Sequence, residues 1–303
     1  MAAFMKQSKP KKRKKRASSL LVFGLTFLLF LVVFGGVLAW GMMEFTRQIT
    51  PPVSSSSGTS VNAPTYSEAD TRRLLIVTEQ NKQAQGFVLV VSEPALARVR
   101  AIAIPRETTV AVGVEQTRLF ELYTAQGIAA VRDSLAAALG VTVDHYAVIT
   151  YANIEKAVAH FDNSLLFTLP ETLSYTDESG GYTIKLTSGA HMLTGSQVTG
   201  VLAYPAWHGG RRQRATVQAQ VAAAMINQYL TVGRAEKRDR DFTALVNLVR
   251  SDIYASQYHA DKAAIEFLAS RNNGSLCTAL SANGEYIGNG EAMRFELSEK
   301  PLG

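Results

Sequence analysis

The chain has 303 residues, 47% of them hydrophobic, and a formal net charge of +6 at pH 7. Its first 16 residues carry eight lysines and arginines and no acid, so subtracting those eight charges from +6 leaves −2 for the remainder. The basic balance therefore gives no indication of a nucleic-acid partner for the folded part. The single cysteine, Cys277, excludes an internal disulfide, so the fold must be stabilised by its hydrophobic core alone.

An uncharged apolar run follows this basic stretch, over residues 20–43. At about 1.5 Å per residue, a helix of this length crosses the hydrocarbon core of a bilayer, and the run is longer than the apolar region of a cleaved signal peptide. We therefore predict a basic cytoplasmic tail at 1–18, a retained transmembrane helix at 19–43 and an extracytoplasmic remainder, because positive charge favours the cytoplasmic side. A nucleic-acid or nuclear-targeting patch is the alternative for KPKKRKKR, and the adjoining span disfavours it. A surface protein without disulfides is typical of bacteria.

Residues 44–70 are rich in Ser, Thr and Pro, which predicts a flexible linker, and the folded domain is expected at 71–303. Short apolar runs predict strands, buried on both faces where the run is continuous, at 74–77, 86–91, 97–104, 145–151 and 182–189. Apolar spacings of three and four predict helices at 128–139, 154–161, from about Arg211 to Tyr229, and at 241–253 and 260–270. We predict one α/β domain, a layered α-β-α arrangement around a central mixed sheet, preceded by the transmembrane helix.

The string IAIPRETTVAV at 102–112 places polar residues at the end of a predicted strand. Pro105 lacks a backbone N–H and closes the strand, so Arg106, Glu107 and Thr108 lie at its mouth. A turn into solvent is the simplest interpretation, and a binding site at the edge of the sheet is the alternative.

Three arginines, Arg211, Arg212 and Arg214, lie at the start of the predicted long helix. Cations there face the positive end of the helix dipole, which costs about 0.3–1 kcal/mol each. Arg211 and Arg214 are three residues apart and share a face, so an anion in front of the helix would meet both guanidinium groups and free backbone N–H groups. A solvated basic cap is the alternative.

Other chemistries lack their motifs in this sequence. The five histidines are scattered, and neither they nor Cys277 have the spacing of zinc ligands. The chain has no Gly-x-Ser-x-Gly nucleophile motif and no Gly-rich phosphate loop ending in Gly-Lys-Ser/Thr. These absences argue against a zinc enzyme, a serine hydrolase and a nucleotidase.

Five segments occur in a defined order: IPRET (104–108), LYTAQG (122–127), VDHYAVITYANIEKAV (143–158), SGAHMLTGSQVTGVLAY (188–204) and GRRQR (210–214). In this order and spacing, from about residue 72 to the C-terminus, the chain resembles the LytR-CpsA-Psr family. Its members are membrane-anchored proteins of mostly Gram-positive bacteria that transfer glycopolymers from a polyprenyl pyrophosphate carrier to peptidoglycan. The resemblance implies that Arg106, Arg211 and Arg214 converge on the pyrophosphate as catalytic and substrate-binding residues, with Tyr204 as a further substrate-binding residue.

The chain departs from the family at several charged positions. Glu79 stands where the family has Asp after its first strand, and Gln85 stands where it has Asp before the second. The family holds Mg²⁺ with carboxylates there, so the resemblance implies Glu79 as the remaining candidate ligand for this ion. Glu107 replaces an Asp after Arg106, while PAWH (205–208) lacks two arginines of the family and the Asp usually found before Gly-Arg is absent.

Two functions remain open at this point. The first is an active phosphotransferase-type ligase in cell-wall assembly, in which the three arginines stabilise charge on the pyrophosphate while the link to the acceptor forms. The second is a catalytically degenerate member that binds a polyprenyl-linked anion, or a regulatory partner, without transferring it. The expected partners are a polyprenyl-phosphate-linked glycopolymer, peptidoglycan and the cell membrane, and no nucleic acid.

Overall fold

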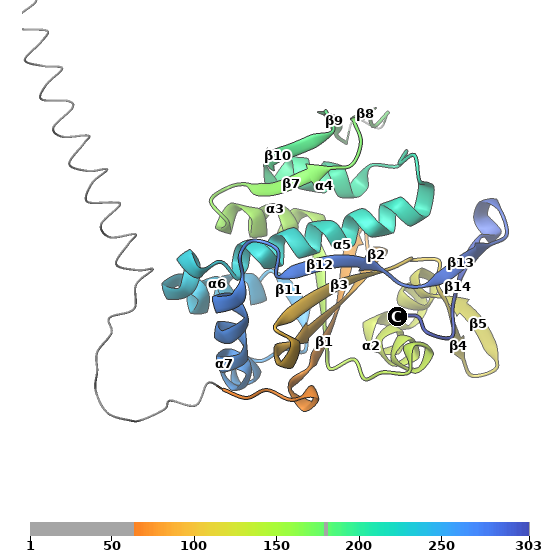
Figure 1. Ribbon diagram of the computed structural model, residues 1–303. Helices are drawn as coiled ribbons and strands as arrows, with labels where there is room; N and C mark the ends of the chain where they lie inside the picture. The colour runs from red at the N-terminus through yellow and green to blue at the C-terminus, as the bar shows by residue number, and fades with distance from the viewer. Residues whose placement is uncertain (1–63, 179–180, 303) are drawn as a thin grey trace, which may run out of the picture. The chain divides into compact units, whose positions relative to one another are not determined.

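A mixed β-sheet lies at the centre of the folded chain (Figure 1). The structure is a computed structural model that describes residues 64–178 and 181–302; the predicted basic tail, the predicted membrane anchor and most of the predicted linker lie outside these residues. Within the described part the sheet has six strands, which in spatial order are β11 (Val249–Ser251), β6 (His145–Thr150), β1 (Arg72–Gln80), β2 (Gln83–Glu93), β3 (Arg98–Ile104) and β12 (Cys277–Ser281). β1 is parallel to β6 and β3 is parallel to β12, while the other neighbours are antiparallel. The prediction of a central mixed sheet is confirmed.

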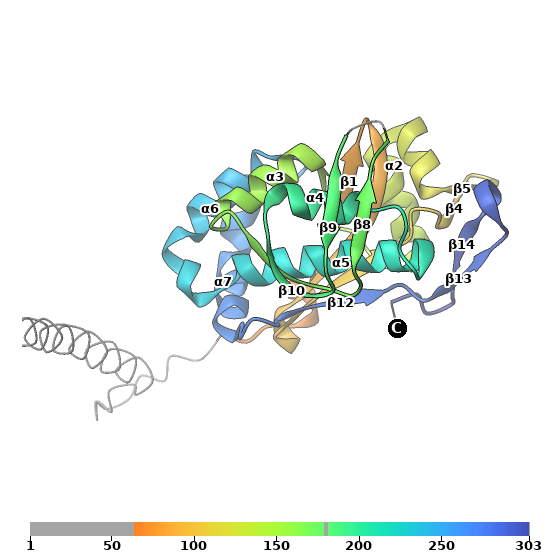
Figure 2. The same cartoon turned by 90° about the horizontal axis from the view of Figure 1, so that it is seen from above.

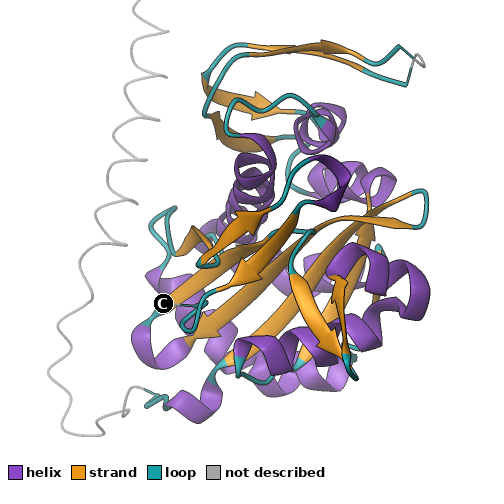
Figure 3. Cartoon of the chain, turned by 90° about the vertical axis from the view of Figure 1, so that its right-hand side faces the viewer, coloured by secondary structure: helices purple, strands orange, loops and turns teal. Residues whose placement is uncertain are grey.

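Helices cover both faces of this sheet (Figure 3). They are α2 (Leu119–Leu139), α3 (Tyr151–His160), α4 (Gly195–Ala203), α5 (Gly210–Tyr229), α6 (Arg238–Val246) and α7 (Ala255–Arg271). Short 3-10 turns lie between the larger elements: η1 (Glu68–Asp70), η2 (Pro94–Leu96), η3 (Val232–Lys237) and η4 (Gly290–Ala292). α2 packs on one face of the sheet, and α5 and α7 pack on the other, which gives the predicted α-β-α layers. Across residues 64–178 and 181–302, no helix combines the length and the apolar character needed to cross a bilayer.

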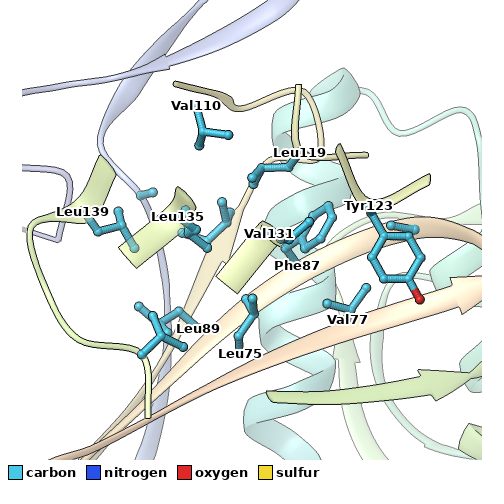
Figure 4. Packing of buried hydrophobic residues seen from close by; sticks show 14 of the residues in the cluster. Leu75, Val77, Phe87, Leu89, Val110, Leu119, Tyr123, Val131, Leu135 and Leu139 are labelled. Carbon is cyan, nitrogen blue, oxygen red and sulfur yellow. The ribbon is translucent and has the colours of Figure 1, made fainter. Parts of the chain in front are cut away.

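The continuous apolar run of β2 is explained by burial on both faces. Phe87 and Leu89 point toward α2, where they meet Val131 and Leu135 (Figure 4). Val88, which alternates with them, points to the opposite face and packs in the cluster that α5 and α7 complete. A strand with helices on both sides has no face for polar side chains, and the run therefore lacks the polar alternation of a half-exposed strand.

Two-stranded pairs surround the central layers (Figures 1 and 2). They are β4 (Thr109–Val112) with β5 (Glu115–Arg118), β7 (Leu165–Leu169) with β10 (Gly189–Leu193), β8 (Leu173–Thr176) with β9 (Thr183–Leu186), and β13 (Gly284–Ile287) with β14 (Arg294–Leu297). Most of these short strands have mixed polar and apolar residues, and only the segment that contains β9 was predicted as a strand.

One predicted helix is wrong in its second half. The helix expected at 241–253 ends at Val246, and Val249–Ser251 instead forms β11 along the outer edge of β6. The edge of β6 offers unpaired backbone groups to the following segment, and pairing with that edge overrides the local helical pattern. The end predicted for the helix at 128–139 is confirmed: it forms the second part of α2, and Gly140, with φ 66°, follows Leu139 and donates its N–H to carbonyls of the last turn.

Candidate anion site at the end of the central sheet

Three of the predicted site residues meet at one end of the central sheet, in a cleft of about 450 Å³. Arg106 lies two residues after the end of β3, and Arg211 and Arg214 lie at the start of α5. α5 crosses β2, β3 and β12, so the sheet supplies one guanidinium group and the helix supplies two. The residues that line the cleft are Gln85, Arg106, Glu107, Arg118, Phe120, Arg211, Arg214, Ala215, Gln218 and Glu291.

The IPRET segment does not turn into solvent. Glu107 and Thr108 have exposed fractions of only 6% and 0%. The backbone N–H of Phe295 donates to the Glu107 carbonyl at 2.8 Å, and Thr108 forms an isolated bridge with Phe295, so the β13–β14 pair fixes the segment from outside. The solvent-turn interpretation is therefore wrong, and the alternative of a binding site at the edge of the sheet stays a prediction.

Gln85 occupies the space between two of the arginines. Its Oε1 accepts from Arg106 Nη1 at 3.4 Å and from Arg214 Nη2 at 3.2 Å. Gln85 reaches this position because the register of β1 and β2 shifts here, with Thr78 opposite Gly86 and Glu79 opposite Ala84. The extra residue in such a bulge is re-aimed out of the ladder. The neutral carbonyl holds the two guanidinium groups without cancelling their charge.

Glu107 is the acid that orders the other side of the cleft. Its Oε1 lies 3.2 Å from Arg211 Nη1 and 3.8 Å from Arg106 Nε. Arg211 also donates from Nη2 to the Gly290 carbonyl at 2.8 Å. The same Glu107 oxygen therefore contacts both arginines, and it contacts Arg211 more closely than Arg106.

Burial and mutual repulsion both act on Arg106. Burial lowers the pKa of its guanidinium, Arg214 and Arg211 lower it further, and Glu107 opposes them. Arginine remains charged in spite of such shifts. The Phe120 ring lies 4.5 Å from Arg106 Cζ, and this cation–π contact stabilises the cation without occupying its N–H groups.

Arg118, which the sequence analysis did not single out, is the fourth arginine of the cleft. It ends β5, and its Cζ lies 4.8 Å from the centre of the Phe120 ring. Its Nη2 donates to the Glu121 carboxylate and its Nη1 to the Glu291 carbonyl. The sequence signal for Arg118 is its position directly before a helix, near the helix N-terminus as Arg211 is.

Two other residues of the sequence analysis lie elsewhere. Arg212 points away from the cleft: its Nη2 donates to the Gly284 carbonyl at 3.1 Å, and its Cζ lies 5.6 Å from the Tyr286 ring. Tyr204 is buried at the end of α4, edge-on to Trp207 with ring centroids 5.1 Å apart, and does not line the cleft. The expected separation of Arg212 from its neighbours is confirmed, whereas Tyr204 has the surroundings of a core residue.

Glu79, the candidate magnesium ligand, is already paired. Its Oε2 accepts from the Tyr123 hydroxyl and from Arg250 Nη2, the latter at 3.3 Å. Glu107 likewise contacts arginine, and Gln85 offers only a carbonyl that two arginines share. Nowhere in the described chain do three His, Cys, Asp or Glu side chains gather where they could hold a metal ion. The residues at this end of the sheet do not fit Mg²⁺, which prefers several free oxygen ligands.

An apolar cavity of about 260 Å³ lies behind the arginines, between the sheet and α5 and α6. Gln218 lines both the cleft and this cavity. Gly86 makes room for it, because a Cβ on Gly86 would lie 1.7 Å from Gln218 Oε1. A second cavity of about 300 Å³ shares Leu74, Phe242, Leu245 and Ile253 with the first. The polar cleft and the apolar cavities thus adjoin one another, with the buried Gln218 side chain between the cleft and the first cavity.

Comparisons with known proteins agree with this architecture. The LytR_cpsA_psr family profile matches residues 68–299. A putative transcription regulator from Eubacterium siraeum DSM 15702 superimposes with a TM-score of 0.69 at 15% identity, over 82% of this chain and 95% of that chain. B. subtilis TagV has a TM-score of 0.64 at 16% identity, over 77% and 92%, and the structure of TagT bound to LIIa-WTA has 0.58 at 14% identity, over 77% and 87%. A search of curated proteins finds no match.

The family match spans most of the chain, while identities of this size to solved structures show the fold alone. The chain belongs to the LytR-CpsA-Psr family.

Proposed function

We propose that this chain binds a polyprenyl pyrophosphate-linked glycopolymer outside the cell membrane and transfers the glycopolymer to peptidoglycan. One observation carries the proposal: the arginine cleft and the apolar cavity meet at Gln218. Such a pair of sites suits a molecule with an anionic head and a long hydrocarbon tail. The family membership of the chain, and the LIIa-WTA complex of TagT, support this substrate class.

The charge of the cleft favours the pyrophosphate. Its lining holds four arginines and two glutamates, which leaves an excess of two positive charges. Arg106 and Arg214 both bond the neutral Gln85 oxygen, and the contact of Arg106 Nε with the Glu107 carboxylate is long, at 3.8 Å, so the N–H groups that face Gln85 can turn to an arriving phosphate. Hydrogen bonds from guanidinium to phosphate are charge-assisted and are stronger than neutral ones.

The apolar cavity favours the lipid. Its wall includes Ile76 and Ile149 from the sheet and Val221 and Leu245 from α5 and α6. An apolar chain placed there leaves water at about 0.8 kcal/mol per buried CH₂ group. The two cavities together provide for several prenyl units, with the remainder of a longer chain outside them.

The transfer step follows from the position of the head group. A hydroxyl oxygen of the acceptor attacks the sugar-bearing phosphorus, the P–O bond to the lipid phosphate breaks, and polyprenyl monophosphate leaves with the bonding electron pair. The hydroxyl proton passes to water at the open cleft. Arg106, Arg211 and Arg214 stabilise the charge that develops on the leaving phosphate, and they do so without an ion supplied from elsewhere.

A second function, binding without transfer, is favoured by a specific observation. Glu79 is engaged by Tyr123 and Arg250, so it is not free to take the proton of the acceptor. In this alternative the same cleft and cavity hold the lipid-linked glycopolymer as a carrier or regulatory site.

Binding is tested with geranylgeranyl pyrophosphate, inorganic pyrophosphate and geranylgeraniol as probes in titrations of the purified folded domain. We expect the complete amphiphile to bind at least about tenfold more tightly than either half. Ala222→Phe, which fills the apolar cavity, should remove this advantage and leave inorganic pyrophosphate binding unchanged. Equal affinity for the head group and the amphiphile would contradict the proposal.

Transfer is tested separately, with a prenyl pyrophosphate-linked disaccharide and peptidoglycan as substrates. Release of prenyl monophosphate together with glycan attachment supports the ligase. Tight binding without release would select the carrier function instead.

A further inference from the structure

A second, larger cleft adjoins the arginine cleft. It has a volume of about 930 Å³, and its lining residues come from the β4–β5 pair, α2, β14 and the residues that flank β14. These elements lie near one another in Figure 1. Arg118 lines both clefts and therefore marks their common border. The volume is near the upper end of the range for small-molecule sites, so the cleft has room for more than a single sugar-sized ring.

The charges of this second cleft cancel. Its lining contains two arginines and two glutamates, and they are paired as Arg118 with Glu121 and Arg294 with Glu296, the latter at 2.8 Å. The lining of the arginine cleft next to it, without the shared Arg118, has three arginines and two glutamates, which is an excess of one positive charge. A ligand that is anionic at one end and uncharged at the other would match the two clefts in turn.

The remaining walls combine hydroxyl groups with small apolar side chains. Ser134 and Ser298 supply hydroxyls that can donate and accept, and the Thr109 hydroxyl, which donates to the Phe295 carbonyl at 3.2 Å, can accept. The exposed Ala137 and Ala138 are the small apolar residues that α2 contributes to the cleft. A ring that carries hydroxyls on its rim and C–H groups on its faces can satisfy both kinds of wall at once. A lipid chain has no hydroxyl groups that could bond those of the wall. An anion would meet arginines that are already paired with glutamates in this cleft.

We propose that this second cleft binds an uncharged oligosaccharide next to the pyrophosphate. The inference rests on the proposed function, since it places the saccharide beside the head group of that substrate. Two molecules contain such an oligosaccharide: the glycan attached to the lipid carrier and the glycan strand of the acceptor. Arg118, at the border, would contact the junction between sugar and phosphate.

The test uses a blocking variant and a matched control on the same helix. Ala138→Trp puts an indole into the cleft from an exposed position. Ala129→Trp makes the same change at another exposed alanine, about 180° around α2 and outside the cleft. A second cleft variant, Arg294→Ala, removes a half-exposed side chain whose partner Glu296 is also half-exposed, so the fold does not depend on it.

Three probes separate the two sources of saccharide: chitotetraose in the presence of geranylgeranyl pyrophosphate, geranylgeranyl pyrophosphate alone, and its disaccharide-linked form. If the cleft holds the acceptor strand, Ala138→Trp should abolish chitotetraose binding and Arg294→Ala should weaken it about tenfold. If the cleft holds the carrier's glycan, both variants should instead remove the affinity that the disaccharide adds to the prenyl pyrophosphate. Ala129→Trp should change neither.

The inference is overturned if neither cleft variant alters either saccharide-dependent affinity, or if Ala129→Trp has the same effect as Ala138→Trp. Geranylgeranyl pyrophosphate alone should bind all the variants equally. Failure of the wild-type chain to bind that probe would refute the proposed function, and is therefore distinguishable from failure of the saccharide site.

Discussion

Single side chains decide how much positive charge the arginine cleft presents. Arg106 is held by the Gln85 carbonyl and the Phe120 ring, and Arg214 is held by the same carbonyl. These two groups are neutral, and the contact of Arg106 with the Glu107 carboxylate is long, at 3.8 Å, so most of the anion affinity of the two arginines is not used up inside the protein. Arg211 differs, because it is the closest cation to the buried Glu107 carboxylate.

Replacing Arg214 by Ala tests whether the cleft is a phosphate site. We expect prenyl pyrophosphate binding to weaken by about 1.5–3 kcal/mol, which is the range for hydrogen bonds to charged groups. Arg212→Ala is the matched control, since Arg212 lies at the same helix end but contacts the β13–β14 pair. If the two variants have equal affinity for the lipid in a titration, the arginine cluster is a basic surface and not a phosphate site. Arg211→Ala is a less specific test, because it also removes the closer cation of Glu107 and leaves that carboxylate with Arg106, at 3.8 Å.

Gln85→Glu keeps the shape of the side chain and adds one negative charge between Arg106 and Arg214. Charge-assisted hydrogen bonds to both guanidinium groups should raise the melting temperature. The same charge competes with phosphate, so pyrophosphate affinity should fall by about tenfold or more. Calorimetry gives both quantities, and a gain in stability without a loss of affinity would mean that phosphate binds away from Gln85.

The pairing of Glu79 leads to a prediction about magnesium. We expect the purified domain to bind Mg²⁺ no more tightly than about millimolar, because its acidic groups in this region already contact Arg250, Arg211 or Arg106. Titration calorimetry measures this directly, with Glu79→Gln expected to leave the heat unchanged. Micromolar affinity of the wild-type domain for Mg²⁺ would show that Glu79 releases Arg250 and binds the ion instead.

The elements around the cleft depend on one break in a helix. α2 is interrupted at Gly127, which has φ 80° and ψ −171°. The first segment carries Phe120 to the arginine cleft, and the second carries Val131 and Leu135 into the core on the sheet. In a straight helix Phe120 would lie only about 20° around the axis from Val131, so both would point in nearly the same direction.

Gly127→Ala should lower the free energy of unfolding by about 1–3 kcal/mol, because only glycine adopts this backbone region without strain. Gly233→Ala is the control, as Gly233 has no positive φ and open space around it, and its replacement should be neutral or stabilise by about 0.4–1 kcal/mol. Urea denaturation of the two variants measures the difference. Equal stabilities would show that the break at Gly127 is not required by the fold.

For the molecule as a whole, the sequence predicts on which side of the membrane the arginine cleft lies. Eight cations and no acid precede the uncharged run at 20–43, so we expect the described domain to lie outside the cytoplasm. Protease added to intact spheroplasts should remove residues 44–303 and leave the basic tail protected. Protection of the C-terminus would reverse the orientation and with it every extracytoplasmic role proposed above.

The central strands and the position of the arginines could be predicted from local sequence alone. The apolar run at 86–91 requires burial on both faces, Pro105 ends the strand before Arg106, and a spacing of three places Arg211 and Arg214 on one face of a helix. Each of these inferences depends on residues within one or two helical turns of each other, where backbone geometry fixes the directions of the side chains.

The partners of those arginines were decided by the tertiary structure. Gln85 meets Arg214 across 129 positions, and Glu79 meets Arg250 across 171. A bulge in β2 aims Gln85, and the pairing of β11 with β6 brings Arg250 into reach, in a segment whose local pattern predicted a helix. Tyr204 likewise packs in the core against the ring of Tyr175, 29 positions earlier in the chain, as well as against the nearby Trp207. Which neutral or charged group meets each arginine depends on which strands are neighbours, and strand pairing between distant segments leaves no pattern in the local sequence.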